Sequence, residues 1–177
     1  MNRTRRDEQP EDSEQKAKDI CLRLLTARPR TRAELIQALA RKGIPEQLAE
    51  RVVGTLDRAA LINDADYAET WVHSRHTYDG LARRALITEL KRKGVDESIA
   101  AEAASAVDSS AEEQRARQLV RKKLRTSDSA DEATRVRRLV GVLARKGYPQ
   151  GLAYRVVREE LRAAGHSGGV LDDVPID

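Results

Sequence analysis

Few residues in this chain of 177 could carry out chemistry, and they are not grouped as a catalytic site requires. The single cysteine, Cys21, lies among apolar residues, where a small core side chain is expected rather than a reactive thiol. His73 and His76 have a spacing that zinc tolerates on a helix, but no cysteine or third histidine accompanies them. The sequence contains no Gly-rich phosphate loop and no His-Glu-x-x-His motif. We therefore expect a protein that is not an enzyme and that holds no metal or other cofactor.

Cationic side chains are the remaining candidates for a site, and they are spread unevenly. The chain has 33 Lys and Arg against 29 Asp and Glu, a formal charge of +4. Residues 15–62 carry a net +5, residues 63–110 a net −3 and residues 111–165 a net +7. Such alternation favours a partner of mixed charge over a plain nucleic-acid clamp, although either basic end could contact nucleic acid.

The tripeptide Arg-Lys-Gly occurs three times, ending at Gly43, Gly94 and Gly147. Apolar residues at helical spacing precede and follow each copy, which indicates an internal repeat of helix, glycine stop and helix. A glycine after two cations is typical of a helix C-terminus, and Pro45 and Pro149 then open the next helix. Helix capping on a solvated surface is the simpler interpretation of each Arg-Lys pair, and contact with a partner is the alternative.

Composition and periodicity predict an all-α protein, because Ala, Leu, Arg, Glu and Lys dominate and no strand pattern occurs. With aromatic residues at 3% and no Phe, a tandem array of three three-helix repeats fits better than one deep core. The predicted repeats span 15–62, 63–110 and 111–165, between a disordered tail at 1–14 and a flexible acidic tail at 166–177. The first predicted helix covers 15–27, the second runs from the Thr31 cap to the glycine stop at Gly43, and the third covers 45–60. The fourth begins within 63–66, and the others cover 81–93, 96–108, 111–125, 132–146 and 149–164.

Two local patterns place the helices more closely. Thr31 and Glu34 form a capping box, which predicts where the second helix begins. Tyr67 and Trp71 are one helical turn apart, and we expect both to pack in the interior rather than stack on bases. No apolar run is long enough for a signal peptide or a membrane span, so we expect a soluble, cytoplasmic protein with no membrane contact. Separately, we expect it to be a monomer.

The chain resembles the RecX family of regulatory proteins, which modulate the bacterial recombinase RecA. The resemblance covers roughly residues 15–164. It is carried by Asn63 to Arg75, by Arg83-Arg84 leading to Glu89 to Val95, and by the arrangement of the three repeats. The chain departs from the family pattern at Tyr67, where Phe is common, and has Gly80-Leu81-Ala82 where Gly-Pro usually precedes the paired arginines.

The resemblance implies an elongated, curved array that lies in the groove of the RecA–DNA filament and inhibits strand exchange and ATP hydrolysis. It also implies a place in homologous recombination, DNA repair and the SOS response. A direct DNA-binding protein of helix-turn-helix type, with the paired cations on phosphates, is the alternative, and a scaffold unconnected with DNA is a third. The residues expected to contact the RecA filament or DNA are all basic: Arg75, Arg83, Arg84, Arg92, Lys93, Arg121, Lys122, Lys123, Arg135, Arg138, Arg145 and Lys146. Arg137 is expected to extend the same basic surface.

Overall fold

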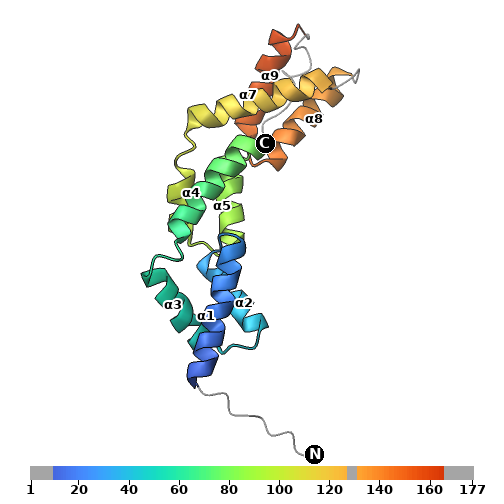
Figure 1. Ribbon diagram of the computed structural model, residues 1–177. Coiled ribbons are helices and arrows are strands. Elements are labelled where there is room, and N and C mark those ends of the chain that lie inside the picture. Colours follow the sequence, from blue (N-terminus) through green and yellow to red (C-terminus); the bar gives the residue numbers. More distant parts are fainter. Residues whose placement is uncertain (1–9, 127–130, 166–177) are drawn as a thin grey trace, which may run out of the picture. The chain divides into compact units, whose positions relative to one another are not determined.

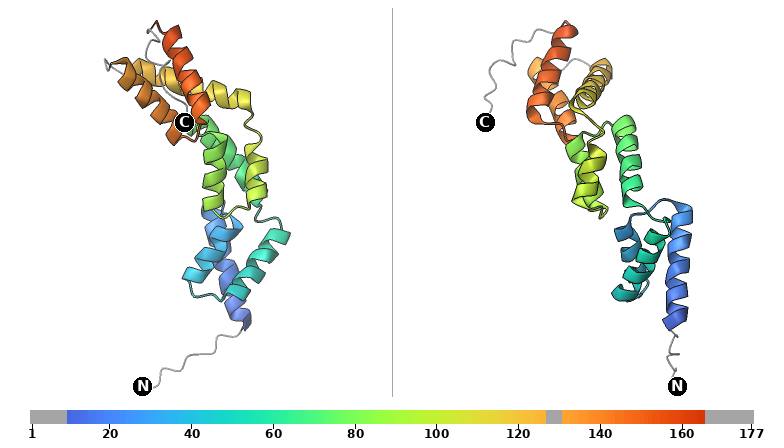
Figure 2. Two further views of the ribbon diagram at one scale, coloured as in Figure 1. Left: turned by 180° about the vertical axis from the view of Figure 1, so that it is seen from behind. Right: turned by 90° about the vertical axis from the view of Figure 1, so that its left-hand side faces the viewer.

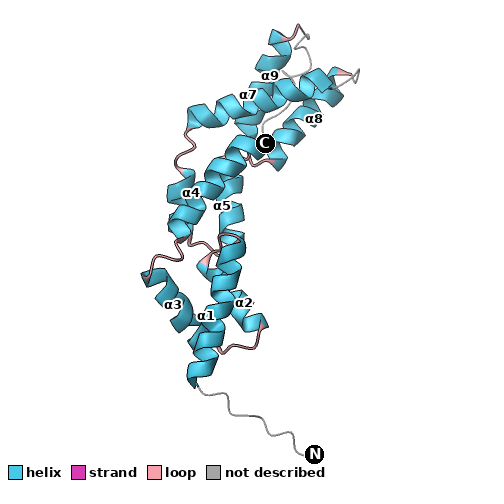
Figure 3. Ribbon diagram, in the orientation of Figure 1, coloured by secondary structure: helices cyan, strands magenta, loops and turns pink. Residues whose placement is uncertain are grey.

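The computed structural model describes residues 10–126 and 131–165, and these residues form helices with no β-strand among them (Figures 1 and 3). The prediction of an all-α fold built from three repeats of three helices is confirmed. The helices of the described part are α1 (Pro10–Ala27), α2 (Arg32–Arg41), α3 (Glu46–Arg58), α4 (Asp64–Ser74), the π-helical segment η1 (Arg75–Asp79), α5 (Arg83–Arg92), α6 (Glu97–Ala104), α7 (Ser109–Thr126), α8 (Glu132–Arg145) and α9 (Gln150–Ala163).

Helix α1 begins five residues earlier than expected, so residues 10–14 are helical and do not belong to a disordered tail. Pro10 suits the first position of a helix because its missing N–H would have no intrahelical partner there. Glu11 and Asp12 follow in the first turn, where carboxylates interact favourably with the helix dipole. Residues 1–9 and the acidic tail at 166–177 lie outside the described residues.

One compact unit comprises residues 10–70 and 90–100. Its core lies between α1, α2 and α3, which pack against one another in both views of Figure 2. Cys21 is fully buried in this core, and burial raises the pKa of its thiol, as expected of a packing residue. The other buried apolar residues of this core are Ala17, Leu35, Leu39, Ile44, Leu48, Ala49, Val52, Val53, Leu56 and Ile62.

The second unit comprises residues 71–89, 101–126 and 131–165. Here α9 packs against both α7 and α8, and the core between them is lined mainly by valine and leucine (Figure 2). Tyr148 is buried in this core and donates its hydroxyl to the Gly80 carbonyl at 2.9 Å. Burial raises the pKa of Tyr148, so this hydroxyl stays protonated and remains a donor.

The helix starts are fixed by side chains, as the sequence predicts for Thr31. The Thr31 hydroxyl accepts from the Glu34 N–H at 3.1 Å, and the Glu34 carboxylate accepts from the Thr31 N–H at 3.1 Å, which completes the capping box. In the second unit Asp131 caps α8 by accepting from the Thr134 N–H at 2.9 Å. Hydrogen bonds from Thr134 lower the pKa of Asp131 and favour its charged form.

The sequence did not predict η1, and it placed two neighbouring helix ends wrongly. The expected helix over 81–93 begins at Arg83 instead, after η1 and a left-handed Gly80. The expected helix over 96–108 ends at Ala104. Asp108 accepts from the Ala111 N–H at 2.8 Å and caps α7, and an N-cap residue needs non-helical backbone. Ser105, Val107 and Asp108 are also weak helix formers, so the expected helix extended past its actual end into the start of the next one.

Candidate functional site

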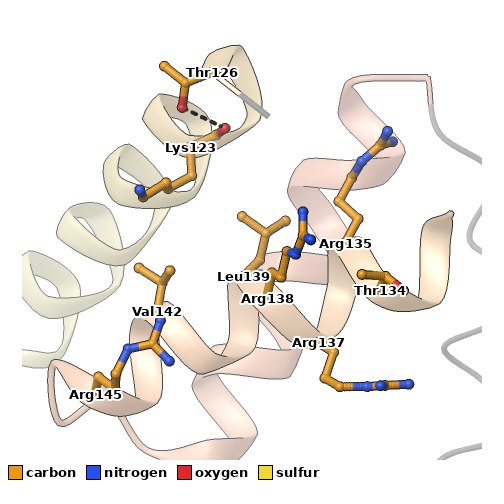
Figure 4. Close-up of a pocket in the computed structure, with 9 residues that line it drawn as sticks. All are labelled: Lys123, Thr126, Thr134, Arg135, Arg137, Arg138, Leu139, Val142 and Arg145. Atoms are coloured by element: carbon orange, nitrogen blue, oxygen red, sulfur yellow. Dashed lines mark hydrogen bonds between the residues drawn. The ribbon is translucent and has the colours of Figure 1, made fainter. Parts of the chain in front are cut away.

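A pocket of about 690 Å³ lies on the second unit, between the C-terminal part of α7 and one side of α8. Figure 4 shows Lys123 reaching toward it from α7, and Arg138 and Arg145 reaching toward it from α8. Its other lining residues supply apolar carbon, hydroxyl groups and two more guanidinium groups: Thr126, Thr134, Arg135, Arg137, Leu139 and Val142.

The helical period brings these cations together. Residues three, four and seven apart share one side of a helix, so Arg135, Arg138, Val142 and Arg145 form a stripe along α8. Leu139, next to this stripe, is buried in the core and fixes how α8 faces α7. The sequence identified four of the five cations as partner-contacting residues, and the pocket brings those four together.

Three of the five cations that line the pocket have no ion-pair partner among the described residues. Lys123, Arg138 and Arg145 are exposed, and no described carboxylate forms an ion pair with any of them. Arg137 is exposed on the other side of the α8 stripe, and its charge helps to lower the pKa of Asp131. Like charges at this spacing repel one another, so the pocket favours an anion that several cations can share, such as a carboxylate cluster or a phosphate group.

Arg121, expected in the same binding cluster, belongs to an internal ion-pair network instead. Its Nε donates to Glu160 Oε2 at 2.7 Å and its Nη2 donates to Glu160 Oε1 at 3.0 Å. The Glu160 carboxylate is buried and also accepts from Arg117 Nη1 at 3.3 Å. Arg121 therefore has a structural partner that the sequence did not reveal. Lys122 is exposed and does not line the pocket.

Replacing Glu160 with Gln should lower the free energy of unfolding at pH 7 by about 1–2 kcal/mol, because Arg117 and Arg121 lose a shared charged acceptor. Hydrogen bonds from Arg121 lower the pKa of Glu160 below its ordinary 4.5. The stabilisation is therefore present above pH 4.5 and is lost as the pH falls through the lowered pKa. Urea unfolding of both proteins between pH 3 and 7 measures this, and the two curves should converge toward the acid end. Curves that stay parallel would contradict it.

Arg75, another expected contact residue, is also held internally. Its Nε and Nη2 donate to the two Glu89 oxygens at 3.1 and 3.0 Å, and its Nη1 pairs with Asp79 at 2.5 Å. The guanidinium carbon lies 5.3 Å from the ring centroid of Trp71, whose indole N–H also donates to Glu89 at 3.0 Å. Trp71, which was expected to face the interior, is half-buried, and its indole is part of a polar clamp with Arg75 and Glu89.

The other expected residues divide into exposed and internally bound groups. Arg84 and Arg92 are exposed and Arg83 is half-buried, with its backbone N–H donating to Glu112 at 2.8 Å. Lys93 forms an ion pair with Glu34 at 3.7 Å, and Lys146 donates to the Asp79 carbonyl at 2.5 Å. Lys146 thus caps a helix end, as the capping interpretation of the Arg-Lys pairs expects. The helix end is that of η1, at the Asp79 carbonyl, and not that of α8.

Neither a metal site nor a membrane span can be assigned in the described part of the chain. No group of three His, Cys, Asp or Glu residues there could hold a metal ion. None of the described helices has the length and apolar character to cross a membrane.

Three sequence models of one family match the chain. They describe the first three-helix domain of RecX, which matches residues 17–56, the second, which matches 63–103, and the third, which matches 111–157. The chain is 58% identical over 168 residues to "Regulatory protein RecX" of Amycolatopsis mediterranei, covering 95% of this chain and 96% of that protein. It is 47% identical over 172 residues to "Regulatory protein RecX" of Streptomyces coelicolor, covering 97% and 92%.

The fold has a solved counterpart in the crystal structure of RecX from Lactobacillus salivarius. The TM-score is 0.75 over 85% of this chain and 97% of that one, at 23% sequence identity, which supports the fold alone. The three matched domains coincide with the helix sets α1–α3, α4–α6 and α7–α9. With its three matched domains and its full-length relatives, the chain belongs to the RecX family of regulatory proteins.

Proposed function

We propose that this protein binds the RecA–DNA filament and inhibits RecA, suppressing strand exchange and ATP hydrolysis in recombination and DNA repair. The observation that carries the proposal is the match to RecX regulatory proteins over nearly the whole chain. The protein would act by occupying a surface and not by catalysis, as a monomer in the cytoplasm where RecA filaments form.

The pocket on α7 and α8 suits this role. It presents Lys123, Arg138 and Arg145 to solvent, and a filament of protein and DNA offers both carboxylates and phosphates. Exposed cations of this kind steer a partner and fix its register more than they add raw affinity. The cations held by internal carboxylates, such as Arg75 and Arg121, are expected to contribute through the fold.

Direct DNA binding is the second candidate, favoured by the same pocket, because helix pairs with exposed basic residues can hold phosphates without any protein partner. The two functions differ in what binding requires. We expect the protein to bind RecA filaments on single-stranded DNA more tightly than bare single strands, and to slow ATP hydrolysis by those filaments. Fluorescence anisotropy and an ATPase assay at equal salt measure both. Equal affinity for bare DNA would favour the second candidate.

Replacing Lys123, Arg138 and Arg145 together with Gln should weaken filament binding and inhibition by about 10- to 100-fold at moderate salt, since each charge contributes up to about 1 kcal/mol. The melting temperature should stay unchanged or rise slightly, because relief of repulsion offsets the lost cation in the last turn of α8. A titration of inhibition against protein concentration measures the effect.

A matched control removes the same charge elsewhere. Arg23, Arg51 and Arg162 are exposed and do not line the pocket, so replacing these three with Gln should leave inhibition nearly intact. If both triple variants lose inhibition equally, net charge rather than the pocket governs binding, and if both inhibit as well as the parent, neither the pocket cations nor net charge governs it.

A further inference from the structure

The pocket between α7 and α8 combines cations with apolar carbon. Lys123, Arg138 and Arg145 reach toward it, and Leu139 and Val142 supply the apolar part of its lining (Figure 4). None of the described residues that line it is an aspartate or a glutamate. A ligand that carries only charge, such as phosphate, would leave the apolar lining in contact with water. The pocket therefore fits an acidic stretch of polypeptide that also carries aliphatic side chains.

The chain contains such a stretch in its acidic tail, directly after α9. Residues 166–177 read His-Ser-Gly-Gly-Val-Leu-Asp-Asp-Val-Pro-Ile-Asp. They include no Lys or Arg, so Asp172, Asp173 and Asp177 give the tail a net charge of −3. Each aspartate has an aliphatic neighbour in the sequence: Leu171, Val174 or Ile176. The tail thus carries both kinds of group that complement the pocket.

The acidic tail starts close to the pocket, because the end of α9 is fixed against α7. Glu160 accepts from Arg121 Nε at 2.7 Å, and Arg121 precedes the pocket residue Lys123 by two positions. Gly165, the last described residue, follows Glu160 by five positions, which is about 8 Å of helix. Asp172 follows Gly165 by seven positions, which gives an extended reach of about 24 Å. The tail is therefore long enough to pass around a helix about 10 Å wide and enter the pocket.

The short tether makes weak contacts sufficient for docking. A segment joined to its site by a short chain has an effective concentration in the millimolar range. Exposed ion pairs are individually weak and are screened by salt. Aliphatic side chains that pack on Leu139 and Val142 add hydrophobic free energy, which salt does not screen. Charge and apolar contact together therefore favour the tail over a free anion.

We propose that the acidic tail, residues 166–177, docks in the pocket between α7 and α8. Its aspartates lie on Lys123, Arg138 and Arg145, and its aliphatic side chains pack on Leu139 and Val142. The tail then competes with the filament for the same cations, so that only molecules with an undocked tail bind the filament through the pocket. This competition rests on the proposed function, whereas the docking of the tail does not.

Disulfide trapping in the full chain tests the docking. Val142→Cys places a thiol in the pocket lining and Val174→Cys places one in the tail, so docking brings the two thiols together. The only natural cysteine, Cys21, is fully buried and does not compete. In oxidised glutathione this pair should close about 10-fold faster than the control pair Gln118→Cys with Val174→Cys. Gln118 is exposed on α7 outside the pocket and lies three positions from Arg121, so an undocked tail reaches it as easily.

Removing the charge of the tail should abolish this preference. With Asp172→Asn, Asp173→Asn and Asp177→Asn together, the two closure rates should come to within about 3-fold of each other. Equal rates for the two pairs with the natural aspartates would mean that the tail does not enter the pocket, which is then left to external anions. A preference that survives all three changes would mean that charge does not direct the tail. Either result overturns the proposal.

Inhibition assays measure the consequence for the filament without the added cysteines. The three aspartate changes should lower the protein concentration needed for half-inhibition of RecA filaments by about 3- to 10-fold, because the pocket is then free. The matched control removes the same charge from exposed carboxylates outside the pocket and should change it by less than about 2-fold. Its changes are Asp66→Asn, Glu69→Gln and Glu102→Gln.

The two assays separate the docking from the proposed function. Equal gains in both triple variants would mean that net charge governs inhibition, which overturns the competition. Trapping of the tail with no gain in inhibition would support the docking and overturn the pocket as the filament contact. If the parent protein does not inhibit RecA filaments at all, the proposed function falls, and the trapping rates still decide whether the tail docks.

Discussion

Replacing Gly147 with Ala is expected to lower the free energy of unfolding of the second unit by about 2–4 kcal/mol. The new Cβ would lie 2.6 Å from the Ala85 Cβ and 2.9 Å from the Ala85 backbone nitrogen, so a helix start would have to move. Left-handed backbone adds a cost of about 1 kcal/mol for any residue with a Cβ. Chemical unfolding followed by circular dichroism measures the loss.

The control for this change is Gly165→Ala in the same unit. Gly165 has a φ of 78°, but a Cβ there would meet nothing within 4 Å. Its replacement carries the backbone strain without the contact, so it should cost about 1 kcal/mol or less. If the two alanine variants were equally stable, close approach at Gly147 would not contribute to the fold.

Replacing Thr31 with Val is expected to cost about 2–4 kcal/mol in the first unit. The hydroxyl makes two hydrogen bonds, accepting from the Glu34 N–H and donating to the Lys93 carbonyl. Loss of the N-cap costs about 1 kcal/mol, and the unsatisfied carbonyl adds about 1–3 kcal/mol, because Thr31 is fully buried and valine cannot donate. Urea unfolding midpoints of the parent and the variant give the difference.

Thr31→Ser is the matched variant, since it keeps the hydroxyl and removes only a methyl group. It should lose less than half as much stability as Thr31→Val. The opposite order would show that packing of the methyl group, rather than the two hydrogen bonds, makes this position sensitive.

The parts of the fold that could be predicted from the sequence are those determined by residues close together in the chain. The Thr31 capping box needs only four consecutive residues, and each glycine turn needs only its own helix end. Both involve residue types with one strong local preference. The repeat spacing then gives the number of helices, because the same local pattern recurs three times.

The candidate site was found only in part, because local patterns do not show which cations meet a carboxylate. Arg121 and Lys123 are two residues apart on α7, yet Arg121 pairs with buried Glu160 and Lys123 faces the pocket. The partner of Arg121 is 39 residues away in sequence. The helical spacing of Arg135, Arg138 and Arg145 is visible in the sequence. Which residue of α7 faces them, however, depends on how the two helices pack in the core.

The clamp around Trp71 gives this protein an optical reporter. The chain has a single tryptophan, so indole emission comes from one place, where the ring stacks under Arg75 and its N–H is bonded to Glu89. Trp71 and Glu89 belong to the second unit, whereas circular dichroism averages over every helix. Comparing the two signals during unfolding therefore distinguishes a chain that melts in one step from one whose two units melt separately.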